Sequence, residues 1–310
     1  TPGVRNAWQV EELHLTENCL TTRGIVAIAA TIHTCPQLRV LDVSMNDFSE
    51  QGSEALGKAL QDHPTIQQLH MSKCRIEDKD GAALINALAL NSSVTYVDLS
   101  SNQLGAGARA LHPQTSCAAV IAKMHESSTP AQISTLVLAF NNLSARHFQM
   151  MANSLQFNKC LKHFDISWNS CKDDGAMALA QALRPNIALS TLDLTHTSIG
   201  EKGTMVIADV LKENKGLSLI KLDDNPIGQR GGRAILRAMR KIQQYGWKRE
   251  ISLAKTNYAL CADSSTLDTQ PLGPKSDKSR SMLMMEKRVA HVERGTTRWL
   301  EVEDEEDTTD

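Results

Sequence analysis

The feature that most constrains the fold is an internal repeat with a period of about 28 residues. The eleven residues from Leu38 to Phe48 fit the pattern L-x-x-L-x-L-x-x-N-x-L, with Asn46 at the asparagine position. The same frame recurs at this period on both sides of this copy, and it resumes after eleven extra residues that follow the fourth copy. The first residues of the eight copies are Val10, Leu38, Ile66, Val94, Ile133, Leu161, Leu189 and Leu217, and a degenerate ninth copy contains Ile251, Leu253, Thr256 and Tyr258.

Each copy continues into a segment with a different period. Gly52 is followed by Ala55, Leu56, Ala59 and Leu60, a spacing that places the apolar side chains on one face of a helix. Later copies repeat this spacing after their own glycine. Each unit is therefore a short strand, a turn and a returning helix, and its apolar faces are buried only when neighbouring units stack.

These units predict an α/β fold: a curved, horseshoe-shaped solenoid with a parallel sheet on the concave face and helices on the convex face. The stack should bend toward the sheet, because strands lie ~4.8 Å apart and helices ~8–10 Å apart. We expect about nine repeats over residues 1–260, with an insertion near 112–131 that lies on the rim or convex side and holds a helix at 118–125. Residues 261–310 are polar and predict a mostly disordered tail, with a short helix at 281–294 and an acidic end.

The asparagine of the pattern has a predicted structural role. The chain turns sharply at this position, and the backbone groups of the turn need partners because a buried unpaired group is costly. An inward-pointing amide both donates and accepts hydrogen bonds, so Asn102 and its equivalents are expected to bridge adjacent repeats. Cys74 and Thr197 occupy the same position with weaker hydrogen-bonding groups.

Repeats of this length with L-x-x-L-x-L-x-x-N/C-x-L and a G-x-x-A-L-x-x-A-L helix resemble the ribonuclease-inhibitor type of leucine-rich repeat. Similar repeats occur in NOD-like receptors, in the GTPase-activating protein for Ran and in CARMIL-type linkers. The resemblance covers about residues 10–260 and is specific for the fold. Our preferred hypothesis for function is a non-enzymatic intracellular scaffold that binds a protein partner on its concave face. Two alternatives stay open, because the fold does not dictate function. The chain could be an activating regulator of a small GTPase, or the sensor arm of a larger receptor-like protein.

Composition narrows the function classes. A formal net charge of −2 gives no global basic surface, so we expect no nucleic-acid partner. The sequence has no run of 18 apolar residues and no secretory segment, which predicts no membrane contact. The first residue is Thr1, so we expect the natural N-terminus to be missing. Seven scattered cysteines without a Cys-x-x-Cys pair predict reduced thiols and a cytoplasmic location. We also expect a monomer with no metal and no cofactor.

No catalytic site is predicted. The sequence lacks the motifs G-x-x-x-x-G-K-[ST], H-E-x-x-H and G-x-S-x-G. Two outward-facing columns are rich in Asp and Ser, and a triad could be drawn from His70, Asp98 and either Ser72 or Ser100. A triad also needs an oxyanion hole, whereas a regular sheet commits its amides to the ladder. We therefore interpret these columns as mainly structural.

The outward-facing column at the strand ends is the candidate partner-binding surface. Met45, Phe140 and Trp168 are large apolar side chains expected to face solvent there, and such groups commonly anchor interfaces. The alternative is that Phe140 and Trp168 only pack on each other across adjacent repeats. Histidines beside carboxylates around this pair predict binding that is sensitive to pH between about 5 and 8. The candidate partner-binding residues are Met45, His70, Tyr96, Phe140, His163, Trp168, Asp193 and His196.

Overall fold

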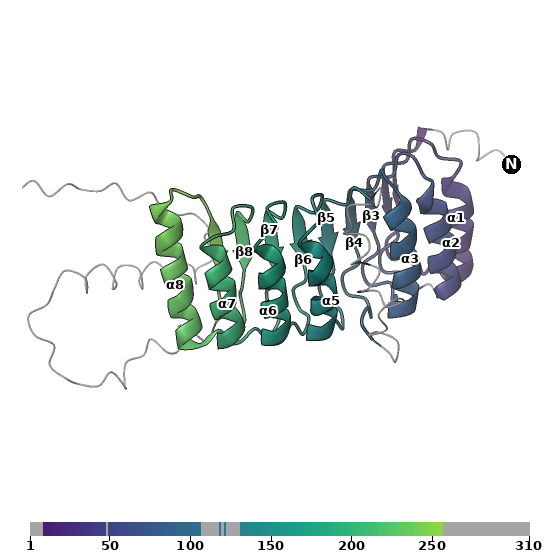
Figure 1. The fold of residues 1–310 in the computed structure, drawn as a ribbon. Coiled ribbons are helices and arrows are strands. Elements are labelled where there is room, and N and C mark those ends of the chain that lie inside the picture. The colour runs from purple at the N-terminus through teal and green to yellow at the C-terminus, as the bar shows by residue number, and fades with distance from the viewer. Residues whose placement is uncertain (1–8, 48, 107–117, 119–120, 122–130, 257–310) are drawn as a thin grey trace, which may run out of the picture.

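The structure is a computed structural model of the 310-residue chain, and it describes residues 9–47, 49–106, 118, 121 and 131–256. These residues form one parallel sheet of nine strands, ordered β1 to β9 along the chain, together with seven helices. Figure 1 shows the helices side by side over one face of the sheet, with the strands behind them. The predicted α/β solenoid is confirmed.

Every strand is three residues long, and its middle residue is the most buried of the three. Leu41 of β2 lies opposite Leu69 of β3, one repeat later in the sequence, which confirms the predicted frame. The sequence separation between opposite residues is larger where the frame has extra residues, as between Val97 of β4 and Leu136 of β5. The strands are β1 (Glu12–His14), β2 (Val40–Asp42), β3 (Gln68–His70), β4 (Tyr96–Asp98), β5 (Thr135–Val137), β6 (His163–Asp165), β7 (Thr191–Asp193), β8 (Leu219–Lys221) and β9 (Glu250–Ser252).

The helices return the chain to the start of the next strand. Their buried residues repeat at helical spacing, as in α2, where Leu56 and Leu60 are fully buried. Each helix packs on its neighbour, for example α5 on α6 and α7 on α8. The helices are α1 (Thr22–Ile32), α2 (Glu50–Gln61), α3 (Asp78–Leu90), α5 (Ala145–Leu155), α6 (Lys172–Leu183), α7 (Glu201–Leu211) and α8 (Gly228–Gln244).

The core between sheet and helices is mainly aliphatic. Phe148 and Phe164 are its largest fully buried side chains, and most of the rest are Leu, Ile, Val and Ala. Cys74 and Cys171 are fully buried, as the repeat frame predicts. Burial raises the pKa of the Cys74 thiol to about 11 and also raises the pKa of the Cys171 thiol, so both are neutral thiols. The five described cysteines are unpaired.

Asn102 closes the turn after β4 in the predicted way. Its Nδ2 donates to the carbonyl oxygen of Met71 in the preceding repeat at 2.8 Å. Its Oδ1 accepts from the backbone amides of Cys74 and Ile76 in that repeat, at 3.0 and 3.1 Å. The side chain therefore satisfies backbone groups that no strand ladder reaches. The equivalent residues Asn46, Asn141, Asn169 and Asn225 also donate to the preceding repeat and accept from its amides.

A second set of side chains bridges the repeats at the opposite end, between each helix and the next strand. Asn91 donates to a carbonyl oxygen of the preceding helix at 2.7 Å and accepts from the amide two residues further on at 2.7 Å. His63 occupies the equivalent position, and its ring contacts the carbonyl oxygen of Ile32 at 3.1 Å and the amide of Thr65 at 3.5 Å. This set was not predicted from the sequence, although its recurrence at the repeat period is visible there. The set comprises His63, Asn91, Asn158, Asn186 and Asn214.

Two residues of the insertion belong to the core. Ala118 and Ile121 are helical and fully buried, and they join the same apolar cluster as the strands. Most other residues of the predicted insertion and of its helix at 118–125 lie outside the described residues, as do the tail, its predicted helix at 281–294 and the acidic end.

Candidate functional site

The strand-end column has an unusual backbone conformation. Its residues adopt positive φ angles between 52° and 58°, the left-handed region, which costs a residue other than glycine about 1–2 kcal/mol. None of them is Val, Ile or Thr, the side chains that this conformation tolerates least. That absence was the sequence signal for the conformation, which was not predicted. The column comprises Glu17, Met45, Lys73, Ser101, Phe140, Trp168, His196, Asp224 and Lys255.

Three neighbouring residues of this column form a ring stack. The ring centroids of Phe140 and Trp168 are 4.6 Å apart with an interplanar angle of 11°. The rings of Trp168 and His196 are closer, with centroids 3.9 Å apart and an angle of 18°. His196 Nδ1 lies 2.8 Å from a carboxylate oxygen of Asp224, the next residue of the column. Four successive repeats therefore contribute to one continuous row of contacts.

The stack follows from the geometry of the repeat. Adjacent parallel strands lie ~4.8 Å apart, and residues with the same backbone conformation in successive repeats direct their side chains in parallel. Planar rings at that spacing can stack face to face, as Phe140 and Trp168 do. Both faces of Trp168 are covered by its neighbours, yet the residue is 40% exposed and Phe140 is 50% exposed. The rings therefore pack on each other across adjacent repeats and also reach solvent, and partner binding at these rings stays a prediction.

A hollow lies beside the ring stack at the turn edge of the sheet. Its volume is about 380 Å³, and Trp168 and His196 form part of its wall. The remaining lining is mostly polar, from the asparagines that close the turns and from exposed hydroxyl groups. The hollow is lined by Asn141, Asn142, Leu143, Trp168, Asn169, Ser170, His196 and Ser198.

The other candidate residues do not join the stack. His70 and Tyr96 form a separate ring pair on β3 and β4, with centroids 4.8 Å apart and tilted by 35°. Burial raises the pKa of the Tyr96 hydroxyl. Met45 is 39% exposed in the strand-end column, but Lys73 and Ser101 occupy the column positions between it and Phe140.

The polar surroundings of the stack differ from the expected ones. His163 is exposed at the start of β6, at the opposite end of the strand from the turn that holds Trp168. Asp193 forms an ion pair with Lys221 at 2.9 Å, and a different carboxylate contacts His196. That carboxylate belongs to Asp224, because the left-handed conformation directs both side chains along the column.

The acidic column on the strands has the predicted structural role. Oδ1 of Asp98 accepts from the backbone amide of Ser100 at 2.8 Å, and Oδ1 of Asp165 accepts from the amide of Ser167 at 3.0 Å. Oδ1 of Asp42 likewise accepts from the backbone amide of the serine two residues later, at 2.9 Å. Burial raises the pKa of Asp165, which the bonds from Ser167 partly oppose. These carboxylates are committed to the backbone of their own strand ends.

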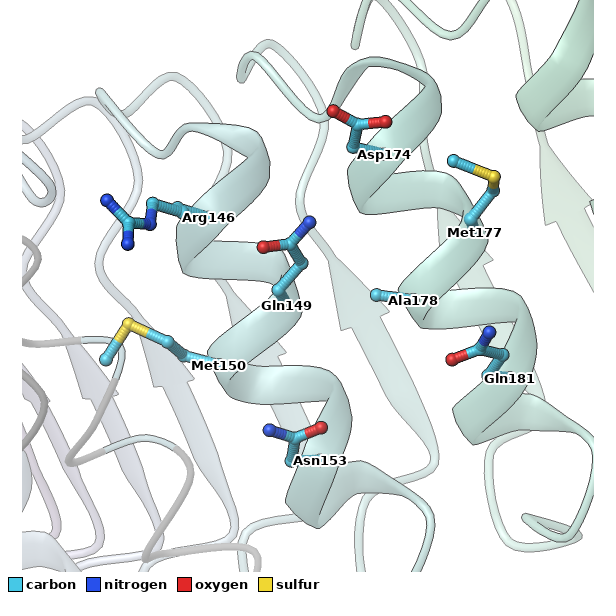
Figure 2. A pocket seen from close by; sticks show the side chains of 8 residues that line it. All are labelled: Arg146, Gln149, Met150, Asn153, Asp174, Met177, Ala178 and Gln181. Atoms are coloured by element: carbon cyan, nitrogen blue, oxygen red, sulfur yellow. The ribbon is translucent and has the colours of Figure 1, made fainter.

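The helix side has a separate groove that was not predicted. It lies between α5 and α6, has a volume of about 620 Å³ and includes residues at equivalent repeat positions, such as Met150 and Ala178 (Figure 2). Gln149 and Ala178 extend into the space between the two helices, whereas Arg146 points away from α6 (Figure 2). Its lining residues are Arg146, Gln149, Met150, Asn153, Asp174, Met177, Ala178 and Gln181.

Two features are absent from the part of the chain that the structure describes. There, no three His, Cys, Asp or Glu side chains are grouped so that they could hold a metal ion. No helix in that part combines the length and the apolar content needed to cross a bilayer.

Comparisons with known proteins place these features in a family. The family model described as "Leucine Rich repeat" matches residues 10–29, 62–84, 90–111 and 157–180. Ribonuclease inhibitor from Sus scrofa is 27% identical over 172 residues, which is 55% of this chain and 35% of that protein. NACHT, LRR and PYD domains-containing protein 4E from Mus musculus is 28% identical over 144 residues, 46% of this chain and 14% of that protein.

The matches are partial in length. The chain spans about a third of the ribonuclease inhibitor and about a seventh of the NACHT, LRR and PYD protein. Among solved structures, Leiomodin-1 actin-binding site 2 aligns over 51% of this chain and 90% of that chain, at 20% identity. Its TM-score of 0.35 is too low to support any inference about binding. The repeat frame, the parallel sheet with its helical layer and these matches show that the chain is a leucine-rich-repeat solenoid, similar to proteins of the ribonuclease-inhibitor type.

Proposed function

We propose that this chain is a non-enzymatic scaffold that holds a protein partner on the face of the sheet away from the helices. The observation that carries the proposal is the partly exposed ring stack of Phe140, Trp168 and His196. Exposed aromatic surface is unfavourable in water, and covering it contributes about 25 cal/mol for each Å² that a partner buries. Large exposed apolar groups of this kind mark interaction sites.

The surroundings of the stack support the same proposal. The His196–Asp224 contact and the Asp193–Lys221 ion pair lie next to the rings along the sheet. An apolar centre with a polar, solvent-accessible rim is the usual anatomy of a protein interface. The hollow beside Trp168 offers room for one side chain of a partner. We place the scaffold in the cytoplasm, because its described cysteines are unpaired thiols.

The test is a quantitative capture experiment on three matched proteins. Wild-type chain, Trp168→Ala and Phe157→Ala are immobilised, and bound proteins from a cell extract are compared by mass spectrometry. Phe157 is the control because it is 61% exposed but lies just after the end of α5, away from the ring stack. We expect a partner that binds wild type and Phe157→Ala but not Trp168→Ala, with a dissociation constant confirmed on purified proteins. A partner retained equally by all three proteins would place the binding surface elsewhere.

The similarity to NACHT, LRR and PYD proteins favours a second candidate, the repeat arm of a larger receptor-like protein. An immunoblot of the native protein tests it, since an arm of a receptor would migrate well above the 34.0 kDa of this chain. The small-GTPase alternative stays a prediction. A GTP-hydrolysis assay with a panel of small GTPases tests it. If the wild-type chain accelerated GTP hydrolysis by one of them, the chain would be a GTPase regulator and not only a scaffold.

A further inference from the structure

The last helix has an unbalanced charge. α8 contains five basic residues and no acidic residue, although the whole chain has a net charge of −2. Four exposed arginines follow one another at spacings of three, four and three residues, which keeps them on one side of the helix. We call this set the basic stripe. It comprises Arg230, Arg233, Arg237 and Arg240.

The repeat frame shows which way the basic stripe faces. Arg233 lies one repeat after Met205 of α7, which is 40% exposed, and two repeats after Met177, which lines the groove between α5 and α6 (Figure 2). The stripe therefore occupies the outward side of the helical layer. α8 is the last helix of the row, at the opposite end from α1 (Figure 1).

Helix energetics do not explain the stripe. Like charges three or four residues apart destabilise a helix by about 0.2–0.5 kcal/mol for each pair. Arg230 also lies in the first turn, where the helix dipole disfavours positive charge. Within the described residues, the only ion pair of the stripe joins Arg230 to Glu201 at 3.8 Å. The basic stripe therefore destabilises α8, and among the described residues only one carboxylate compensates its positive charge.

The sequence itself contains a segment of complementary charge. Residues 301–310 read EVEDEEDTTD, with seven acidic residues and no basic one. They account for seven of the 35 acidic residues of the chain. The rest of the chain has 28 acidic and 33 basic residues and therefore a net charge of +5. We propose that the acidic segment 301–310 binds the basic stripe of α8 in the same chain. Arginine suits such a ligand, because its planar guanidinium pairs with carboxylates through two parallel hydrogen bonds.

The separation along the chain permits this contact. Forty-four residues separate Thr256, the last described residue, from Glu301. A chain of that length spans at most ~150 Å when fully extended. α8, with 17 residues, is ~25 Å long, so its whole length is within reach. Tethering at this length gives an effective concentration of ~1 mM, enough to make a weak contact prevail within the chain.

The test uses the full chain and a fluorescent peptide with the sequence of residues 301–310. In an acid-neutral variant, the seven acidic residues of the segment are changed to Gln or Asn, which leaves the stripe open to the peptide. Fluorescence anisotropy should show that this variant binds the peptide about tenfold more tightly than wild type, because the wild-type segment competes at ~1 mM against a dissociation constant of ~0.1 mM. Binding should weaken steeply with added salt.

Two variants in the acid-neutral background locate the site. Arg233→Gln with Arg237→Gln and Arg240→Gln should abolish peptide binding, whereas Arg23→Gln with Arg39→Gln and Arg146→Gln makes the same charge change at exposed arginines elsewhere and should retain it. Circular dichroism checks that each variant folds. Equal binding by wild type and the acid-neutral variant would overturn the proposal, as would equal losses in the two triple variants. Binding of phosphatidylserine vesicles by wild type and the acid-neutral chain alike, without peptide binding, would assign the stripe to a membrane surface instead.

Discussion

Trp168 and His196 stack with ring centroids 3.9 Å apart, and both residues have a left-handed backbone, with φ angles of 55° and 52°. The two facts are connected. The amide of Trp168 donates to the carbonyl oxygen of Thr195 in the next repeat at 2.8 Å, and the amide of His196 makes the equivalent bond to Asp223 at 2.9 Å. These bonds hold each turn against the next, so the rings remain parallel at the strand spacing. The candidate binding surface is therefore a product of the repeat's backbone.

Replacing Trp168 by Ala should weaken both partner binding and folding. We expect a loss of about 2 kcal/mol or more in binding free energy, as for other aromatic anchors. Trp168 is not part of the core, but its ring stacks on two neighbours, and each aromatic pair contributes about 0.5–1.5 kcal/mol. Denaturant titration should therefore show a loss of about 1–2 kcal/mol. Met45→Ala, in the same column but outside the stack, should leave stability nearly unchanged, and equal losses in both variants would contradict this account.

Glycine should be better tolerated than alanine at position 168. Both substitutions remove the ring, but only glycine adopts a φ of 55° without steric cost. We expect Trp168→Gly to be more stable than Trp168→Ala by about 1 kcal/mol, measured by denaturant titration of the pair. At Leu69, in the middle of β3, the order should reverse, because glycine weakens a strand. An alanine variant at 168 as stable as the glycine variant would mean that the turn relaxes once the ring is gone.

The sequence predicts the strands and their buried faces because the repeat period and the alternation within each strand encode them directly. Leu41 and Leu69 could be placed opposite each other on that basis alone. The side-chain directions in the strand-end column could not be predicted, since they depend on the left-handed conformation that bonds between repeats impose. The contact of His196 with Asp224 of the next repeat could therefore not be predicted. The position of a residue in the repeat was enough to predict whether it is buried in the core. The contacts of the surface side chains could not be predicted without the geometry of the turns.

Ile121 should be important for folding although it lies in the insertion. It is fully buried in the main apolar cluster, and truncation of such a side chain costs about 2–5 kcal/mol. Ile187→Ala is the matched control, because Ile187 is 72% exposed and the same truncation there should change stability by less than about 0.5 kcal/mol. Thermal unfolding of the two variants measures the difference. Shortening the insertion should preserve folding only if Ala118 and Ile121 are kept, so an Ile121→Ala protein as stable as wild type would show that the segment is dispensable.

Asn102→Ala should destabilise the stack at one turn. The side chain bridges to the preceding repeat through Met71, Cys74 and Ile76, and a buried group left without a partner costs about 1–3 kcal/mol. With several such groups affected, we expect the upper end of that range in a denaturant titration. Asn142→Ala removes the same side chain at an exposed position and should cost less than about 0.5 kcal/mol. A cost below ~0.3 kcal/mol for Asn102→Ala would show that the turn closes without this amide.

His63 should make folding sensitive to acid. It is 3% exposed, and burial is the main cause that lowers the pKa of its imidazole, with the nearby His33 adding to the effect. The neutral ring suits its two contacts, because Nε2 donates to the carbonyl oxygen of Ile32 while Nδ1 accepts from the amide of Thr65. Protonation of Nδ1 would remove that acceptor. A lowered folded-state pKa means that the unfolded chain takes up the proton first as the pH falls below about 6.5.

The matched variant is His63→Asn, since asparagine makes the same two bonds at Asn91, Asn186 and Asn214. The His63 contribution is fully present above the unfolded pKa and is lost as the pH falls toward the lowered folded-state pKa. Other groups titrate identically in both proteins, so the informative quantity is the difference between their free energies of unfolding. We expect this difference to be constant between about pH 7.5 and 8.5 and to shift in favour of His63→Asn from about pH 6.5 to pH 5, by denaturant titration at each pH. A difference independent of pH over that range would show that His63 is charged or solvated in the folded protein.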